Sequence, residues 1–207
     1  MFITFEGPDG SGKTRQIQPL ARFLEEKGYK VFTAREPGGT TIGDQVRAIL
    51  MNLENTSMRP RTEALLFCAA RAQLVDEVLR PHLAQGEVVL LDRYADSTFA
   101  YQGYGHQHDL ALIKSLLDFA TGGLKPDLTL LLDVDPQIGL KRRQAGGGEW
   151  NRLDAYQLQY HQRVRQGYLK LAESEPERWR IIDASQPPDV VESAIQKVLL
   201  SFLSKLS

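Results

Sequence analysis

The chain reads Gly7-Pro8-Asp9-Gly10-Ser11-Gly12-Lys13-Thr14 directly after an apolar run at residues 2–5. This stretch fits the pattern G-x-x-x-x-G-K-[ST], which in phosphate-binding folds joins a strand to the helix that follows it. Its glycines let backbone N–H groups face phosphate oxygens, and the N-terminus of the helix adds a positive dipole. Lys13 can reach the β- and γ-phosphates, and Thr14 can offer its hydroxyl to Mg²⁺. Together these residues predict a binding site for a nucleoside triphosphate.

Five short runs rich in apolar and β-forming residues recur along the chain, at residues 2–5, 30–34, 88–91, 128–132 and 180–182. Amphipathic stretches separate them, for example residues 62–79, where apolar side chains recur at helical spacing. Strands that alternate with helices pair in parallel through right-handed crossovers. We therefore expect an α/β fold with a five-stranded parallel sheet, helices on both faces, and ligands at the carboxyl edge of the strands. No internal repeat or linker interrupts the pattern, so residues 1–207 are expected to form a single domain.

The charge balance limits the classes of partner. Lys and Arg number 25 against 26 Asp and Glu, a net charge of -1, so the chain lacks the basic excess that nucleic-acid binding needs. No apolar run approaches the roughly 18 residues of a membrane span, and no charged leader precedes an apolar segment. Cys68 is the one cysteine, which suits a reducing compartment. We expect a cytoplasmic protein with neither a nucleic acid nor a membrane as its partner.

A carboxylate stands where a P-loop enzyme holds its metal ion. Asp92 ends the apolar run at residues 88–91, so it is expected at the same edge of the sheet as Thr14. The two side chains together predict a Mg²⁺ site. An acid at the end of a strand can instead cap the next turn, and the sequence leaves this alternative open.

Further segments occur at characteristic spacing. They read Arg35-Glu36-Pro37-Gly38-Gly39-Thr40, Leu65-Leu66-Phe67-Cys68-Ala69-Ala70-Arg71, Asp92-Arg93-Tyr94, Ser97-Thr98-Phe99-Ala100-Tyr101-Gln102-Gly103 and Asn151-Arg152-Leu153-Asp154. With Phe5-Glu6-Gly7, they resemble the thymidylate kinase family over nearly the whole chain. The resemblance implies the P-loop nucleoside monophosphate kinase fold and a homodimer. It also implies ATP-dependent phosphorylation of thymidine 5′-monophosphate (dTMP) to the diphosphate, with Mg²⁺ as the cofactor.

The resemblance assigns side chains to the acceptor nucleotide. Arg71 and Arg93 are implied to bind its phosphate through charge-assisted hydrogen bonds, helped by Arg35 or Arg47. Phe67 and Arg71 lie one helical turn apart, so both project from one face of their helix. The resemblance implies that Phe67 stacks on thymine and that Arg71 binds a base carbonyl. Packing in the core is the alternative role for Phe67.

Small polar side chains complete the implied substrate site. They are Glu36, Ser97, Thr98 and Gln102, the last three at the edge of the base. Tyr101 is implied to lie where a ribose 2′-hydroxyl would be, which would select deoxyribose. Asp9 resembles the acid of the family that takes the 3′-hydroxyl of the sugar and faces the metal. An Asp that bonds its own backbone within the loop is the alternative.

The implied reaction needs no general base. The acceptor is a phosphate monoester whose second pKa is about 6, so at pH 7 it is already mostly a dianionic nucleophile. Catalysis then consists of positioning and charge neutralisation by Lys13, Arg93 and the metal ion that Asp92 helps to hold.

A basic segment at residues 141–153 is expected to form a lid. Some members of the family carry an arginine in the phosphate loop, whereas this chain has Gly10 there and resembles the bacterial class, which uses lid arginines. Arg143 and Arg152 are the expected catalytic arginines, and Gly146-Gly147-Gly148 is the expected hinge. The middle of the segment holds fewer arginines than that class implies. A solvated basic helix end is the alternative for Arg142 and Arg143.

Two other functions stay open at this point. Another nucleoside monophosphate kinase or a deoxynucleoside kinase would share the loop and lid but lack the Tyr101-Gln102 and Phe67/Arg71 pairs. A nucleotide-gated binding protein would share the loop yet need no second phosphate acceptor, and the arginine set argues against it.

Overall fold

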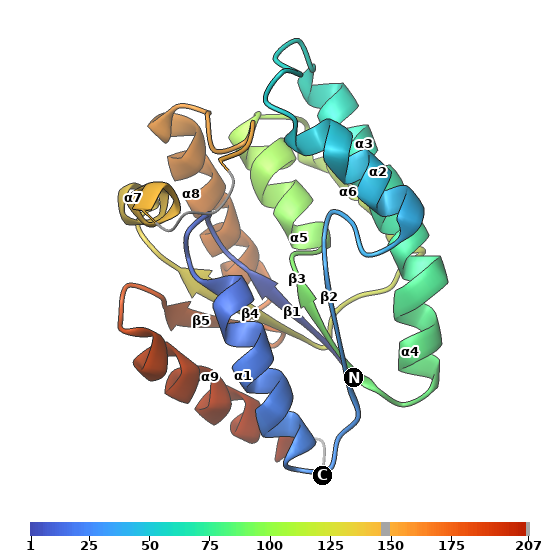
Figure 1. Ribbon diagram of the computed structural model, residues 1–207, viewed down its shortest axis with the longest axis vertical. Coiled ribbons are helices and arrows are strands. Elements are labelled where there is room, and N and C mark those ends of the chain that lie inside the picture. The colour runs from blue at the N-terminus through green and yellow to red at the C-terminus, as the bar shows by residue number, and fades with distance from the viewer. Residues whose placement is uncertain (146–149, 206–207) are drawn as a thin grey trace.

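The computed structural model describes residues 1–145 and 150–205 and arranges them around a five-stranded parallel sheet in the order β2-β3-β1-β4-β5 (Figure 1). The strands are β1 (Phe2–Glu6), β2 (Val31–Arg35), β3 (Val88–Asp92), β4 (Leu128–Asp133) and β5 (Trp179–Asp183). The predicted strands and their parallel pairing are confirmed. The central strands β3, β1 and β4 are almost entirely buried, as their continuous apolar sequences predict.

Helices cover both faces of the sheet. On one face, α1 (Lys13–Glu25) and α9 (Pro188–Leu203) run side by side and bury apolar side chains such as Leu20 and Ile195 against the strands (Figure 1). On the other face, α3 (Pro60–Leu74) continues into the π-helical η1 (Val75–Leu79), which packs on β3. On the same face, α8 (Leu158–Ser174) packs on β4 and β5. The helix predicted at residues 62–79 is therefore present as α3 and η1.

The remaining helices connect these layers and carry part of the site. They are α2 (Thr41–Met51), α4 (Arg80–Ala84), α5 (Ala95–Thr98), the π-helical η2 (Phe99–Gly105), α6 (Leu110–Thr121) and α7 (Pro136–Ala145). Thr40 caps α2, because its side chain accepts a hydrogen bond from the Gly43 N–H. π-helical turns are frequent at functional sites, and η2 holds two of the predicted site residues, Tyr101 and Gln102.

The parallel register gathers the predicted site at one edge of the sheet. Asp92 lies opposite Phe5 of β1 and opposite Arg35 of β2, so the phosphate loop, Asp92 and Arg35 meet where these strands end. This edge is where an open α/β sheet binds its ligands. Helix α7 leads from β4 into the expected lid, whose predicted hinge, Gly146-Gly147-Gly148, lies outside the described residues.

Candidate active site

The loop between β1 and α1 requires glycine because it lies against the backbone of other elements. Gly7 has a φ of +136° and Gly10 a φ of +74°, a region that residues with a side chain rarely adopt. A Cβ at Gly7 would lie 2.3 Å from the Leu132 carbonyl oxygen, and one at Gly10 would lie 2.0 Å from the Gly139 carbonyl oxygen of α7. Helix α7 therefore packs directly on the loop and leaves no room for an arginine at position 10. The charge that such an arginine supplies has to come from elsewhere.

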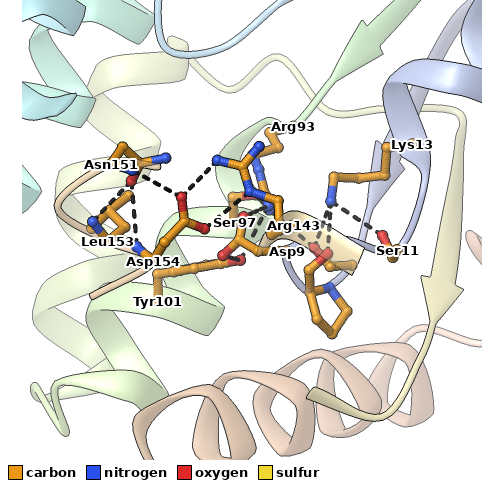
Figure 2. A network of polar contacts seen from close by, with 12 residues as sticks. Asp9, Ser11, Lys13, Arg93, Ser97, Tyr101, Arg143, Asn151, Leu153 and Asp154 are labelled. Carbon is orange, nitrogen blue, oxygen red and sulfur yellow. Dashed lines mark hydrogen bonds and ion pairs between the residues drawn. The ribbon is translucent and has the colours of Figure 1, made fainter. Parts of the chain in front are cut away.

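Lys13 begins α1 and directs its ammonium group back into the loop (Figure 2). Its Nζ donates to the carbonyl oxygens of Gly7 at 2.9 Å and Pro8 at 3.0 Å, and to the Ser11 hydroxyl at 3.2 Å. Burial, and next the nearby charge of Arg93, lowers the pKa of Lys13 to about 8. The group is still mostly protonated at pH 7. It is a buried cation at the position that the motif assigns to the β- and γ-phosphates.

Two oxygen ligands suited to a metal ion meet near Lys13. The Thr14 hydroxyl donates to Asp92 Oδ2 at 2.5 Å, which joins the start of α1 to the end of β3. In nucleotide sites Mg²⁺ takes one or two oxygen ligands from the protein and the others from phosphates and water, so Thr14 and Asp92 fit its chemistry. In residues 1–145 and 150–205, no group of three or more His, Cys, Asp or Glu side chains is arranged to hold a metal ion.

Arg93 follows β3 with a φ of +70°, a left-handed conformation that is uncommon for a residue with a side chain. Its Nη2 donates to Asp9 Oδ1 at 2.6 Å and to the Tyr101 hydroxyl at 3.1 Å. The Tyr101 hydroxyl in turn donates to Asp9 Oδ2 at 2.6 Å, which closes a ring of three side chains (Figure 2). Burial raises the pKa of Asp9, but the charges of Arg93 and Lys13 outweigh burial and lower this pKa overall. Asp9 is an ionised acceptor directed at Arg93 and Tyr101.

Glu6 and Tyr168 support Arg93 from behind, and sequence reasoning did not identify either of them. Arg93 Nη1 donates to the Ser97 hydroxyl at 3.2 Å and to the Tyr168 hydroxyl at 3.1 Å. Both hydroxyls donate to Oε2 of the fully buried Glu6, at 2.6 and 2.9 Å respectively. Burial, and next the charge of Asp96, raises the pKa of Glu6 to about 7. The Ser97 hydroxyl, which was expected at the edge of the base, is therefore engaged in holding Arg93.

Lys13, Asp92 and Arg93 line a cleft of about 690 Å³, a volume that suits small-molecule ligands. Most of the predicted residues line it: Asp9, Gly10, Ser11, Gly12, Lys13, Thr14, Arg35, Glu36, Arg47, Phe67, Asp92, Arg93, Ser97, Thr98, Tyr101, Gln102 and Arg143. Among the described residues that we predicted for the site, Gly7, Pro8, Arg71 and Arg152 do not line it. More Lys and Arg than Asp and Glu side chains face the cleft, so it attracts anions.

Arg71 does not line the cleft but holds two residues that do. It is buried, and its Nε donates to Glu36 Oε2 at 2.8 Å, its Nη1 to the Thr98 hydroxyl at 2.9 Å and its Nη2 to the Tyr94 carbonyl oxygen at 3.0 Å. The guanidinium thereby fixes Glu36 and Thr98, which both line the cleft. Phe67, one turn earlier on α3, is half-buried and lines the cleft itself, which favours contact with a ligand over packing in the core.

Arg142 and Arg143 of α7 both line the cleft. Arg143 donates from Nε and Nη2 to the two oxygens of Asp154, at 3.1 and 2.6 Å (Figure 2). Arg142 donates to the carbonyl oxygens of Ala184 at 2.7 Å and Ser185 at 3.1 Å, just after β5. Each guanidinium is held at the cleft by specific partners, so a freely solvated helix end does not describe them.

Arg152 does not line the cleft, although we had expected it to be a catalytic side chain there. It is buried and forms an ion pair with Glu63 Oε2 at 2.6 Å. Its Nε donates to the Leu50 carbonyl oxygen at 3.1 Å and its Nη1 to the Tyr156 hydroxyl at 2.9 Å. These partners direct the guanidinium away from the cleft and join the C-terminal part of the expected lid to α2 and α3.

The sequence profile of the thymidylate kinase family matches residues 5–195. The chain belongs to the thymidylate kinase family. The thymidylate kinase of Roseiflexus castenholzii is 50% identical over 100% of this chain and 95% of its own length. That of Geotalea uraniireducens is 51% identical over 99% of this chain and 98% of its own length. A crystal structure of thymidylate kinase from Ehrlichia chaffeensis, 36% identical, has a TM-score of 0.77 and covers 96% of this chain and 98% of that chain.

Membership of the thymidylate kinase family confirms the resemblance read from the motifs and the P-loop nucleoside monophosphate kinase fold. The thymidylate kinase match extends from β1 into α9, so it includes the phosphate loop, the ring around Arg93 and both arginines of α7. Within the described part of the chain, no helix has the length and apolar character needed to cross a bilayer.

Proposed function

We propose that this chain is an ATP-dependent kinase that phosphorylates dTMP to the diphosphate. The observation that carries the proposal is a cleft with two separate cationic centres, Lys13 in the phosphate loop and Arg93 in its ring with Asp9 and Tyr101. The first suits the phosphates of a donor, and the second suits the phosphate of an acceptor. The family match and the names of the relatives support dTMP as that acceptor.

The reaction depends on positioned charges. An oxygen of the acceptor phosphate, which is mostly dianionic at pH 7, forms a bond to the γ-phosphorus. The bond from the γ-phosphorus to the bridging oxygen breaks, and ADP leaves with that electron pair. Lys13 and Arg93 offset the repulsion between the two anions, and Arg143 neutralises the charge that develops between them. Thr14 and Asp92 would hold Mg²⁺, which supplies further charge neutralisation at the donor phosphates.

Other residues of the lining serve the acceptor. Arg35 and Arg47 assist Arg93 at the acceptor phosphate, since all three line the cleft. The ring of Phe67 stacks on thymine, as its half-buried position in the lining allows. Tyr101 fills the space of a ribose 2′-hydroxyl, so that deoxyribose is preferred.

The test is ADP formation from ATP and Mg²⁺ with a panel of acceptors: dTMP, dCMP, dAMP, dGMP, ribothymidine monophosphate and thymidine. We expect kcat/KM for dTMP to exceed that for each other acceptor at least about tenfold, and EDTA to abolish turnover. A higher kcat/KM for another acceptor would assign the chain to a different nucleotide or nucleoside kinase. ATP hydrolysis without any acceptor would indicate a nucleotide-gated binding protein.

We further propose that residues 1–207 work as one kinase domain in the cytoplasm, with residues 141–153 as a lid. The single sheet edge that gathers the site supports one domain, and the contact of α7 with the phosphate loop supports a lid that begins beside the donor. The buried free thiol of Cys68 suits a reducing compartment such as the cytoplasm.

We also propose a homodimer that forms through apolar side chains on two packed helices. Leu65 of α3 is 54% exposed, and Leu112 and Phe119 of α6 are 61% and 89% exposed. Helix α3 packs against α6, and Leu112 and Phe119 are seven positions apart, so they share one face of their helix. Exposed apolar surface of this kind marks interfaces, and a two-fold axis would bring the same surface of two copies together.

Replacing Phe119 with aspartate is expected to convert the dimer to a monomer, because it would bury an unpaired charge in the interface. Sedimentation velocity at micromolar concentration measures the change. Leu200→Asp is the matched control, since Leu200 is 45% exposed but belongs to α9 on the opposite face of the sheet, and this variant should stay dimeric. A monomeric parent chain or a dimeric Phe119→Asp variant would contradict the proposal.

A further inference from the structure

Four polar side chains converge on the carboxylate of Glu63, which lies in the first turn of α3 and is 1% exposed. Its Oε1 accepts a hydrogen bond from Gln102 Nε2 at 2.7 Å and lies 3.1 Å from His106 Nε2. Its Oε2 forms the ion pair with Arg152 Nη2 at 2.6 Å and accepts a hydrogen bond from the Tyr156 hydroxyl at 3.2 Å. Gln102 is the member of this group that lines the cleft, so the cluster joins the cleft wall to the lid segment.

The charge of Glu63 determines which way the Gln102 amide points. Burial raises the pKa of Glu63, but the hydrogen bonds of His106 and Gln102 outweigh burial and lower this pKa overall. An ionised carboxylate accepts hydrogen bonds and donates none, so Gln102 must turn its NH₂ group toward Glu63. Its Oε1 then points the other way, and within residues 1–145 and 150–205 no hydrogen bond occupies that oxygen. Gln102 therefore presents an acceptor to the cleft.

We infer that Glu63 is a positioning residue: it fixes the Gln102 amide with its oxygen toward the cleft, and this orientation selects a pyrimidine with an N–H at position 3. Thymine joined to a sugar through N1 has one N–H donor, at N3, whereas cytosine has a lone pair there. An acceptor at this place pairs with thymine and opposes cytosine. The inference rests on the proposed function, because it concerns how the acceptor base is recognised.

The substitution Glu63→Gln would invert this orientation from outside the cleft. The Arg152 guanidinium at Oε2 can only donate, whereas the His106 ring at Oε1 can accept in its other tautomer. An amide at residue 63 would therefore put its oxygen at the position of Oε2 and its NH₂ group at the position of Oε1. That NH₂ group is a donor, so Gln102 would turn its oxygen toward residue 63. The NH₂ group of Gln102 would then face the base.

In Glu63→Gln, we expect the ratio of kcat/KM for dTMP to kcat/KM for dCMP to fall at least about tenfold. The double variant Glu63→Gln with Gln102→Glu should restore most of the ratio, because a carboxylate at position 102 accepts from the amide at 63 and still presents an oxygen to the cleft. Tyr156→Phe is the matched control, since it removes a donor at Oε2 and keeps the hydrogen bond between Glu63 and Gln102. Its ratio should match that of the parent.

Thermal unfolding establishes which variants are folded. A folded Glu63→Gln variant that loses activity equally toward both nucleotides, with an unchanged ratio, would overturn the inference and leave Glu63 a purely structural role. If the single variant does not fold, the double variant decides, because a folded double variant without the preference for dTMP also overturns the inference. Failure of the proposed function is a distinct outcome, since the parent chain would then not prefer dTMP.

Discussion

Lys13→Ala should lower kcat at least about 10²-fold, a loss of about 2.7 kcal/mol in transition-state stabilisation. The ammonium group is a buried cation enclosed by the phosphate loop, where it can meet the charge that moves onto the β,γ-bridging oxygen. Backbone N–H groups of the loop would still bind the phosphates in the variant, so KM for ATP should change less than kcat. Steady-state kinetics with ATP varied at saturating acceptor measure both quantities.

The same substitution should leave the fold intact. Burial opposes the charge of Lys13 and lowers its pKa to about 8, so removing the ammonium group relieves an unfavourable desolvation while it breaks three hydrogen bonds. Lys197→Ala, at an exposed position on α9, is the matched control and should keep the kcat of the parent. A folded Lys13→Ala enzyme with near-parent kcat would disprove the role assigned to the loop.

The parts of the site that the sequence predicts best are those whose requirements are local. Gly7 and Gly12, the two fixed glycines of the phosphate-binding pattern, have φ values of +136° and +90°, a backbone conformation that favours glycine, so this requirement can be recognised from the sequence. Asp92 was predictable because parallel strands end at one edge of a sheet, and it ends the strand beside the loop. The five strands followed from the same kind of reasoning, since buried parallel strands are short continuous apolar runs.

Contacts between segments far apart in the chain leave no pattern in the sequence comparable to the phosphate-loop motif or the apolar strands. Tyr168 donates to Glu6 across 162 residues, and the sequence around Tyr168 reads as an ordinary amphipathic helix. Glu6 did carry a signal, an acid at the end of the first strand and next to the phosphate loop. That signal does not reveal that Glu6 accepts a hydrogen bond from the Ser97 hydroxyl, which in turn accepts one from Arg93.

The positions of Arg143 and Arg152 also depend on contacts that the local sequence does not indicate. Arg152 stands in a segment that resembles the family, and the sequence favoured it as much as Arg143. Their different positions are decided by partners: Glu63, far away in the sequence, holds Arg152 outside the cleft, while Asp154 holds Arg143 at its wall. Nothing in the local sequence around Arg152 indicates a buried acid on α3 that would take its charge.

Arg143→Ala is expected to lower kcat about 10²-fold or more while KM for ATP stays within about threefold. The contact of α7 with the loop leaves no space at Gly10 for an arginine that would neutralise charge between donor and acceptor. Arg143 lies on that same helix, lines the cleft and is oriented by two hydrogen bonds to Asp154. A cation that meets charge developing in the transition state raises kcat without tightening the binding of the ground state.

Matched variants on the same lid separate catalysis from structure. Lys141→Ala removes an exposed cation two positions away on α7 and should change kcat less than about twofold, since it lies outside the lining of the cleft. Arg152→Ala should instead lower the thermal stability, because it leaves the Glu63 carboxylate buried without its cation. If Arg143→Ala turns over within about threefold of the parent, a difference of under about 1 kcal/mol, then the lid only covers the cleft and the neutralising charge must come from another cation of the lining, such as Arg93 or Arg142.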